Sequence, residues 1–322
     1  MSRTISLVLG SGGARGLAHI GVIRELEERD FEIRSVVGCS MGAVIGGCYA
    51  AGKLDDYESW VSELTDWDVV RLLDVSLIPE EGMMKGDHVI EALRELVGDH
   101  DIEDLPIPFT AVATDVIEHR EIWLRQGSLF DAIRASIAIP GLFVPHQVGD
   151  RKLVDGGLLN PVPVAAATRD PTDVTIAVSL LGPDVDEPYG PDADRSEAPE
   201  TTVDRYRRSI DRFIDDLQEK LGWESDEKRE KQQQLGVTEV LLEALDAMQA
   251  AIVRFHLAAY PADILIEIPK NAGRMHEFDR AKPLIAAGRY WAKRALEERS
   301  DGDGRSARPG KGEHDGGGES SR

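Results

Sequence analysis

The sequence predicts an α/β protein with three layers, in which helices cover both faces of a mostly parallel central sheet. Three observations lead to this prediction. Short, continuous apolar runs recur along the chain, helical segments lie between them, and glycine-rich turns follow several of the runs. Uninterrupted apolar runs are typical of parallel strands buried on both faces, and their regular alternation with helices indicates a parallel α/β sheet.

The N-terminal part of the chain contains two strand–helix units. Residues 4–9 (TISLVL) are an apolar run that ends in glycines, and residues 16–29 carry apolar side chains at helical spacing. Residues 35–38 (SVVG) predict a second buried strand, and residues 41–52 predict a helix of small residues that Gly52 ends. Because the units are consecutive, the two strands are expected to lie parallel in one sheet.

The rest of the chain alternates the same two patterns. Helices are predicted at 53–75, 87–98, 128–141, 236–259 and 276–298, and strands at 108–115, 120–127, 151–154, 174–181 and 262–269. Pro140 is expected to stop the helix at 128–141, because its ring removes an amide donor and clashes with the preceding turn.

Changes in composition divide the chain into four parts. After Leu181 the chain becomes acidic and loses its strand-like runs, and its end is rich in Gly, Asp, Ser and Arg. A segment with almost no apolar residue cannot build a core. The prediction is a core at 1–182, an acidic and helical insertion at 183–261, a strand and helix that complete the core at 262–299, and a disordered tail at 300–322.

The chain is strongly acidic. It carries 59 Asp and Glu residues against 37 Lys and Arg residues, a formal net charge of −22. This charge repels phosphate groups, which argues against a nucleic-acid partner and leaves at most a transient, apolar contact with a membrane. An acidic surface also suits a halophilic cytoplasm, because concentrated salt screens the self-repulsion.

Neither a signal peptide nor a spanning helix is predicted. The first apolar run is too short for a signal sequence, and no stretch reaches the roughly 18 apolar residues of a membrane span. Cys39 and Cys48 are the only cysteines, and their positions around one turn and helix argue against a disulfide or a metal site. We therefore expect a soluble, cytoplasmic protein without a metal or another cofactor.

A serine between two glycines is the first candidate for chemistry. Residues 38–42 read GCSMG and match G-x-S-x-G, in which Gly38 and Gly42 leave room for Ser40 at the apex of a strand-to-helix turn. The predicted strand before it and helix after it are the context that this motif requires. Such a turn directs the Ser40 hydroxyl toward the positive end of the helix, which stabilises a developing oxyanion.

A glycine-rich loop, GSGGARG at residues 10–16, follows the first predicted strand. It does not match the dinucleotide pattern, which needs glycine at the position of Arg15, and the GK[ST] phosphate-binding pattern is absent. We instead expect its amides to bind the oxyanion of a tetrahedral intermediate, with Gly12 and Gly13 as main donors and Ala14 as a third candidate. Arg15 either holds this loop and adds positive potential, or forms an ion pair on the first helix turn.

An aspartate precedes two further glycines after the predicted strand at 151–154. Asp155, Gly156 and Gly157 form a DGG turn, whose missing Cβ atoms let a carboxylate approach another loop. Asp-Gly turns are common in proteins, so this motif alone carries little weight. Its place in the chain, after the glycine loop and the serine, gives it significance.

Together the three motifs resemble those of the patatin-like phospholipases of the bacterial and archaeal type. In that family G-G-x-[RK]-G forms the oxyanion hole, G-x-S-x-G carries the nucleophile, and D-G-[GA] supplies the base of a Ser–Asp dyad. The resemblance assigns these roles to residues 12–16, to Ser40 and to Asp155. It extends over residues 4–182 and 262–298 and not over the segment between them.

This resemblance implies a serine acyl hydrolase of the phospholipase A type, which cleaves carboxylic esters of lipids through an acyl-enzyme and needs no cofactor. An unperturbed aspartate, with a pKa of about 3.9, is a weak base at neutral pH. The dyad therefore requires desolvation of Asp155 or its close positioning beside Ser40. Residues 78–89, with two adjacent methionines, are expected to form either a flap over an acyl groove or an ordinary loop.

Several alternatives stay open from the sequence. A Ser–His–Asp triad would take its base from His256 or His276, which follow Asp155 in the chain. The same dyad could serve small esters or thioesters, or the fold could bind lipids without catalysis. The insertion could be a lid, an oligomerisation surface or a partner site. His19 is expected to have a structural role on a helix face, and Cys39 is expected to point away from the apex into the core.

Overall fold

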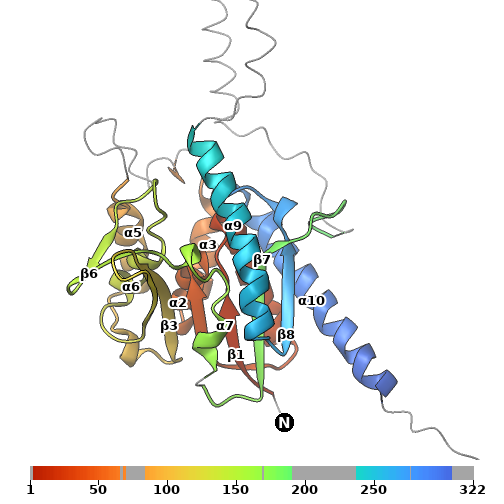
Figure 1. The fold of residues 1–322 in the computed structure, drawn as a ribbon. Helices are drawn as coiled ribbons and strands as arrows, with labels where there is room; N and C mark the ends of the chain where they lie inside the picture. Colours follow the sequence, from red (N-terminus) through yellow and green to blue (C-terminus); the bar gives the residue numbers. More distant parts are fainter. Residues whose placement is uncertain are drawn as a thin grey trace, which may run out of the picture.

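Helices and strands alternate along the chain in the computed structural model, which describes residues 3–65, 68–69, 84–168, 170–190, 237–275 and 277–306. Among these residues, eight strands form one sheet and helices cover both of its faces (Figure 1). The predicted fold class, a three-layer α/β protein with a mostly parallel sheet, is confirmed. No helix within the described ranges has both the length and the apolar character to cross a membrane.

The sheet is built mainly from the buried apolar runs of the sequence. Its strands are β1 (Thr4–Leu9), β2 (Glu32–Cys39), β3 (Phe109–Asp115), β4 (Arg120–Leu124), β5 (His146–Val148), β6 (Arg151–Asp155), β7 (Val174–Gly182) and β8 (Ile264–Pro269). Their order is β5-β6-β3-β2-β1-β7-β8, with β4 paired to β3. The pairs among β1, β2, β3, β7 and β8 are parallel, whereas β3–β4, β3–β6 and β5–β6 are antiparallel.

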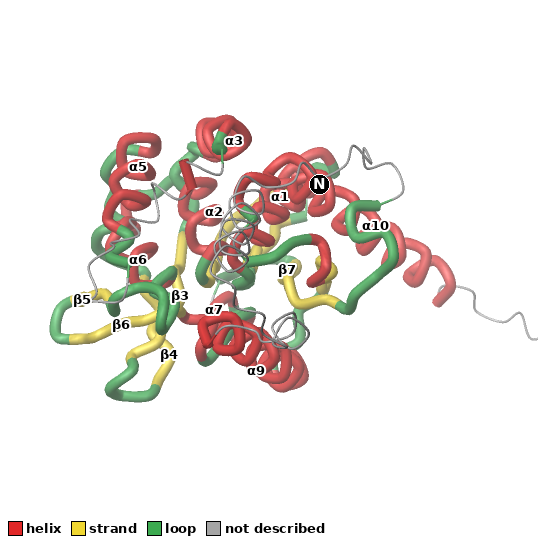
Figure 2. Tube along the Cα trace, turned by 90° about the horizontal axis from the view of Figure 1, so that it is seen from above, coloured by secondary structure: helices red, strands yellow, loops and turns green. Residues whose placement is uncertain are grey.

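Two layers of helices enclose this sheet. The helices are α1 (Ala18–Glu28), α2 (Met41–Ala50), α3 (Leu54–Glu63), α5 (Asp87–Val97), α6 (Leu129–Ser136), α7 (Val164–Ala167), α9 (Val237–Ala259) and α10 (Ala281–Ser306). Figure 2 shows α7 and α9 on one side of the strands, and α1, α2, α3 and α5 on the other. The larger apolar core lies under the second group and also includes α6 and α10.

Successive side chains of β1 point to opposite faces of the sheet and pack against the two helix layers in turn. Leu7 and Leu9 belong to the larger core, whereas Val8 packs in a smaller core with Val37 and with Val253 of α9. The helix α9 comes from the predicted insertion at 183–261. Because Val253 packs against the strands, this helix is part of the layer that covers the second face of the sheet.

The last strand and helix complete the sheet and the first layer. β8 pairs with β7, and α10 packs along α1. Glycines make this helix contact close, since a Cβ on Gly21 would lie 1.9 Å from the Ile285 oxygen. A Cβ on Gly288 would lie 1.8 Å from the Ala18 oxygen. Both helices thus touch backbone to backbone, and a larger side chain at either glycine would separate them.

Four elements differ from the predictions. The helix predicted at 53–75 ends at Glu63, because the backbone at Leu64 is extended, with a ψ of 133°; residues 70–75 lie outside the described residues. α6 ends at Ser136, before Pro140, in agreement with the poor fit of helical backbone just ahead of a proline. The short strand β5 was not predicted, and it pairs with β6 across a turn in which Gly149 has a φ of 58°. α10 continues through 300–306, so the predicted disordered tail begins too early. A helix that is already nucleated extends at little cost per residue.

Candidate active site

Ser40 occupies the turn between β2 and α2. Its φ of 56° and ψ of −124° lie in a region that residues other than glycine rarely adopt. A Cβ on Gly38 would lie 2.3 Å from the Gly42 oxygen, and a Cβ on Gly42 would lie 2.0 Å from the Leu9 oxygen. Both glycines of the predicted motif are therefore required by the close approach of backbone atoms.

A second serine holds this turn and was not predicted. The Ser40 amide donates to Ser136 Oγ at 2.9 Å, and the Ser136 hydroxyl donates to the Val112 oxygen at 2.6 Å. Ser136 is fully buried at the end of α6. It links the serine turn to β3, and no motif marks it because its contact with Ser40 spans 96 positions of sequence.

The structure places Asp155 at the end of β6, with its carboxylate toward Ser40. It accepts a hydrogen bond, 2.7 Å long, from the Gly157 amide. Ser40 and Asp155 line the same small space, and the Ser40 hydroxyl is near enough to act on the pKa of the carboxyl group. Asp155 is 4% exposed. Burial raises the pKa of its carboxyl group to about 6, although the nearby Ser40 hydroxyl and the Gly157 amide favour the charged form. Such a group can accept a proton near neutral pH, which is what the dyad requires.

Cys39 lies beside this carboxylate. Its Sγ is 4.0 Å from Asp155 Oδ1, and the side chain is fully buried in the smaller core. Burial, with the nearby Asp155 charge as a second cause, raises the pKa of the thiol well above its usual value, so the thiol is neutral. The core position predicted for Cys39 is confirmed. Its orientation away from the Ser40 apex stays a prediction.

The glycine-rich loop after β1 lies beside Ser40 and Asp155. Gly12 and Gly13 line the space next to both side chains, and no described residue accepts a hydrogen bond from their amides. Ala14 differs from the prediction, because its amide donates to the Met275 oxygen at 2.9 Å. Two of the three candidate amides are thus without a partner among the described residues.

Arg15 supports this loop and binds α9. Its Nε donates to the Gly12 oxygen at 3.1 Å, and its Nη2 donates to both carboxylate oxygens of Asp246, at 3.1 and 3.0 Å. The Gly12 oxygen and the Gly13 amide belong to one peptide plane, so the Arg15 contact also orients the Gly13 N–H. Loop support and an ion pair therefore both occur. The ion-pair partner comes from the insertion helix and not from the first helix turn.

His19 and His256 do not take the position of a base beside Ser40. His19 is fully buried, and its Nε2 is 2.8 Å from the Gly10 oxygen. Burial lowers its pKa to about 4, so the neutral ring donates this bond. His256 lies near the end of α9 and lines neither space beside Ser40, while His276 lies outside the described residues. In the part of the chain that is described, no histidine hydrogen-bonds to Ser40.

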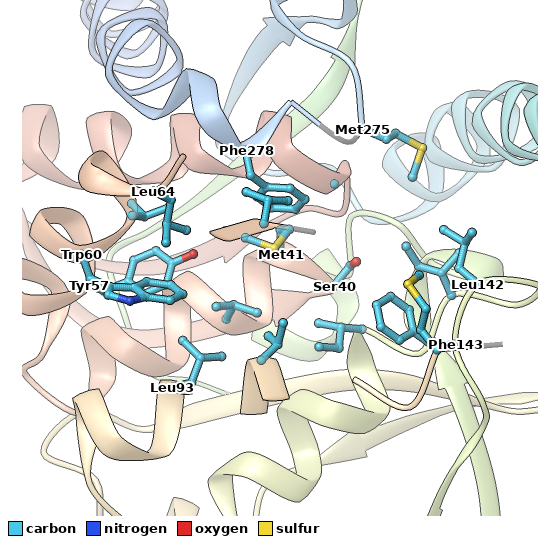
Figure 3. A pocket seen from close by; sticks show the side chains of 18 residues that line it. Ser40, Met41, Tyr57, Trp60, Leu64, Leu93, Leu142, Phe143, Met275 and Phe278 are labelled. Carbon is cyan, nitrogen blue, oxygen red and sulfur yellow. The ribbon is translucent and has the colours of Figure 1, made fainter. Parts of the chain in front are cut away.

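An apolar cavity of about 180 Å³ adjoins Ser40. Figure 3 shows Ser40 between Leu142 and Phe143 on one side and Tyr57 and Trp60 on the other. Of the 18 lining residues, only the side chains of Ser40, Tyr57 and Trp60 contain nitrogen or oxygen. A chain of methylene groups would lose its contact with water here and meet few polar atoms.

The predicted flap contributes to this cavity where it is described. Met84 and Val89 line the wall, and residues 78–83 lie outside the described residues. The Met84 amide donates to the Leu142 oxygen at 2.7 Å, and the Met84 oxygen accepts from the Val144 amide at 3.0 Å. These two bonds join Met84 to the segment that forms the opposite part of the wall.

A second, smaller space also borders Ser40. It measures about 20 Å³, and its polar wall consists of Asp155, Ser11, and Asp246 and Gln249 of α9. Gly12 and Gly13 also line it, and the rest of the wall is apolar, formed by Ile139, Pro140, Leu158, Leu245 and Met275. It is named the polar chamber below. Within the described ranges, no group of three or more His, Cys, Asp or Glu residues is arranged to hold a metal ion.

The fold brings a serine in a strand–helix turn, a buried carboxylate and two amides without a described partner to one small space, an arrangement typical of hydrolases. The model of one family, described as patatin-like phospholipase, matches residues 7–168. The chain belongs to the patatin-like phospholipase family. The predicted family is confirmed, and membership implies hydrolase activity.

Relatives support this assignment over nearly the whole chain. Uncharacterized NTE family proteins of Mycobacterium bovis and Mycobacterium tuberculosis are 40% identical, with 92% of this chain and 92% of theirs covered. Neuropathy target esterase of Drosophila persimilis is 34% identical over 50% of this chain and 12% of its own length. The crystal structure of VipD from Legionella pneumophila shares the fold, with a TM-score of 0.50, 15% identity, and coverage of 92% of this chain and 67% of VipD.

Proposed function

We propose that this protein is a serine acyl hydrolase that cleaves carboxylic esters of lipids, with Ser40 as nucleophile and Asp155 as base. The placement of Ser40 and the buried Asp155 carboxylate on one small space, next to an apolar cavity, carries the proposal. Family membership supports the same class of reaction. Phospholipids with long acyl chains are the proposed substrates, which makes the activity a phospholipase A.

The first half-reaction forms an acyl-enzyme. Ser40 Oγ attacks the ester carbonyl carbon while its proton passes to Asp155. The carbonyl electron pair moves onto oxygen, and the Gly12 and Gly13 amides bind the resulting oxyanion. The bond to the alcohol then breaks, and the alcohol leaves with the proton from Asp155. Ala14 has no part in this oxyanion hole, because Met275 already accepts from its amide.

The second half-reaction releases the acid. Water attacks the acyl carbon, Asp155 accepts one of its protons, and Ser40 Oγ takes a proton back as the acyl–oxygen bond breaks. The products are a free fatty acid and a lysolipid. Each step uses only side chains and amides of this chain.

The apolar cavity supports long-chain substrates over small esters. Each methylene group that moves from water into such a cavity contributes about 0.8 kcal/mol to binding. A short acyl group would leave most of the wall without a contact. We therefore expect kcat/KM to rise with the length of the acyl chain until the cavity is full.

Active-site labelling and two variants test the proposal. A fluorophosphonate probe should react with Ser40 in the folded protein. Ser40→Ala and Asp155→Asn should each reduce kcat on p-nitrophenyl esters and on phospholipid by about a thousandfold or more, since each removes one half of the dyad. Circular dichroism should show an unchanged fold.

Matched variants control for the chemistry of the substitution. Ser59→Ala and Asp150→Asn change exposed residues away from the site and should leave kcat unchanged. A folded protein whose Ser40 does not react with the probe would be a lipid-binding protein without catalysis. Faster turnover of acetyl or thioester substrates than of long-chain esters would instead indicate an esterase or thioesterase of small substrates.

A further inference from the structure

The polar chamber has room for about one water molecule. It measures about 20 Å³, whereas a bound water needs roughly 10–15 Å³ of such space. The acyl chain has its own cavity on Ser40, of about 180 Å³. The chamber can therefore accept a water molecule beside Ser40 and Asp155.

Three polar side chains meet at this chamber. The Ser11 hydroxyl donates to Gln249 Oε1 at 3.3 Å. A Cβ placed on Gly157 would lie 2.7 Å from Gln249 Nε2 and 2.9 Å from Ser11 Oγ. The same point lies 3.0 Å from Asp155 Oδ1. A buried water is held by two to four polar partners, and these three groups can supply them. Only glycine at position 157 lets them approach one another so closely.

The Gln249 side chain keeps a donor for this water. Its Oε1 accepts from Ser11, and among the described residues no group accepts a hydrogen bond from its Nε2. Asp155 is an acceptor and cannot by itself fix the water oxygen. A donor on one side and the carboxylate on the other orient the water, with one lone pair left for attack.

The ion pair between Arg15 and Asp246 fixes α9 over the chamber. Asp246 and Gln249 are three residues apart and share one face of the helix. Arg15 is 3% exposed and also binds the Gly12 oxygen. The loop that carries the proposed oxyanion amides therefore also sets the position of Gln249.

We propose that the polar chamber holds the hydrolytic water of the second half-reaction and that Gln249 is its positioning residue. This inference rests on the proposed function. The water oxygen forms a bond to the acyl carbon of the Ser40 ester, and Asp155 accepts one water proton. The acyl–Oγ bond then breaks as Ser40 takes that proton, and a carboxylic acid leaves. Gln249 donates a hydrogen bond to the water oxygen and exchanges no proton.

The variant Gln249→Leu separates the two half-reactions. Leucine fills a similar volume and suits a helix, but it removes both polar atoms. With a long-chain p-nitrophenyl ester, the burst of p-nitrophenol reports acylation and the later steady rate reports deacylation. The burst rate should stay within about twofold of wild type, while the steady rate falls about tenfold or more. Intact-mass spectra should show the acyl adduct on Ser40 accumulating.

A second variant gives a readout that a structural role would not change. Gln249→Glu places another carboxylate beside Asp155, and like charges raise the pKa of a neighbouring carboxyl group. The pH at which deacylation reaches half its maximum should therefore rise in this variant. If Gln249→Leu fails to fold, this pH profile decides the question.

Met248→Leu is the matched control, because Met248 is 48% exposed on the same helix. Its two rates should equal those of wild type. An unchanged steady rate in Gln249→Leu, or an equal loss of burst and steady rate, would overturn the role in the water step. Wild-type protein that shows neither a burst nor a fluorophosphonate adduct would instead disprove the proposed function itself.

Discussion

Burial of Asp155 sets the pH range in which the dyad can work. Its pKa of about 6 means that the carboxylate accepts a proton only above that pH. We predict that kcat/KM is level from about pH 7 to 8.5 and falls about tenfold for each pH unit below about 6. Initial rates on a soluble ester measure this profile. An inflection near the ordinary aspartate value of about 4 would contradict the desolvated dyad.

The burial of Asp155 also predicts how stability changes with pH, so a loss of activity can be separated from unfolding. Because the folded-state pKa of Asp155 lies above its unfolded value, its contribution to stability is full below about pH 4 and is lost as pH rises through about 6. Acidification through pH 6 therefore does not unfold the protein through this group. His19 acts in the opposite sense, since its pKa is lowered to about 4 and its contribution is lost as pH falls below about 6.5. Thermal unfolding at each pH separates the two effects.

Individual residues differ in how well the sequence reveals them. Ser40 and Asp155 are marked by neighbouring glycines, because each stands in a turn where a Cβ would collide with backbone or with the site. Ser136 and Gln249 have no such marker. Each ends or lies within an ordinary helix, and its contact with the site depends on how α6 and α9 dock, which local sequence does not determine.

Among the elements, α9 is tied to the glycine loop by a nearly buried ion pair. Asp246→Asn removes the negative charge and leaves the Arg15 guanidinium without its counter-ion at 3% exposure. We predict a loss of about 3 kcal/mol in the free energy of unfolding, at the lower end for a broken buried pair. Turnover should also fall, because Arg15 orients the Gly13 amide. Urea denaturation and kcat measure the two effects.

An exposed ion pair supplies the comparison. Arg24 contacts Asp55, whose side chain is 87% exposed. Asp55→Asn should change stability by less than about 1 kcal/mol, because water screens that charge. Equal losses in the two variants would show that the pair between Arg15 and Asp246 has no special role.

Sequence periodicity predicted whether an element is a helix or a strand more reliably than it predicted where the element ends. The buried strands β1, β3 and β7 coincide closely with their apolar runs. β5 has only three residues, too few for a periodic pattern, and it depends on pairing with β6. α10 extends past its last apolar residues into a segment of polar composition. Composition indicates what can build a core, but not how far an established helix continues.

At the scale of the whole molecule, the net charge of −22 opposes compaction. Raising KCl from about 0.1 to 1 M shortens the range of charge–charge interaction from about 10 to 3 Å. We predict that this change raises the Tm by about 5 °C, or roughly 2 kcal/mol. Scanning calorimetry in a KCl series measures it. A Tm that stays constant or falls would contradict the proposed adaptation to high salt.

Much of the architecture could be predicted because parallel strands are buried on both faces and so leave continuous apolar runs. Strand order could not be read in this way, since β7 lies next to β1 and far from it in sequence. The contact of α9 with the active site also could not be predicted from the sequence. The predicted insertion has no family motif, and its only signals are helical spacing and charge.

The meeting of the chain's two halves at one loop has a consequence for biosynthesis. The Ala14 amide, beside the proposed oxyanion donors, is bonded to the oxygen of Met275, and β8 and α10 flank that residue in the sequence. A polypeptide emerging from the ribosome folds from its N-terminal side first. Its serine turn and its aspartate can thus form early, whereas the glycine-rich loop beside them receives its last backbone support only when translation is nearly finished.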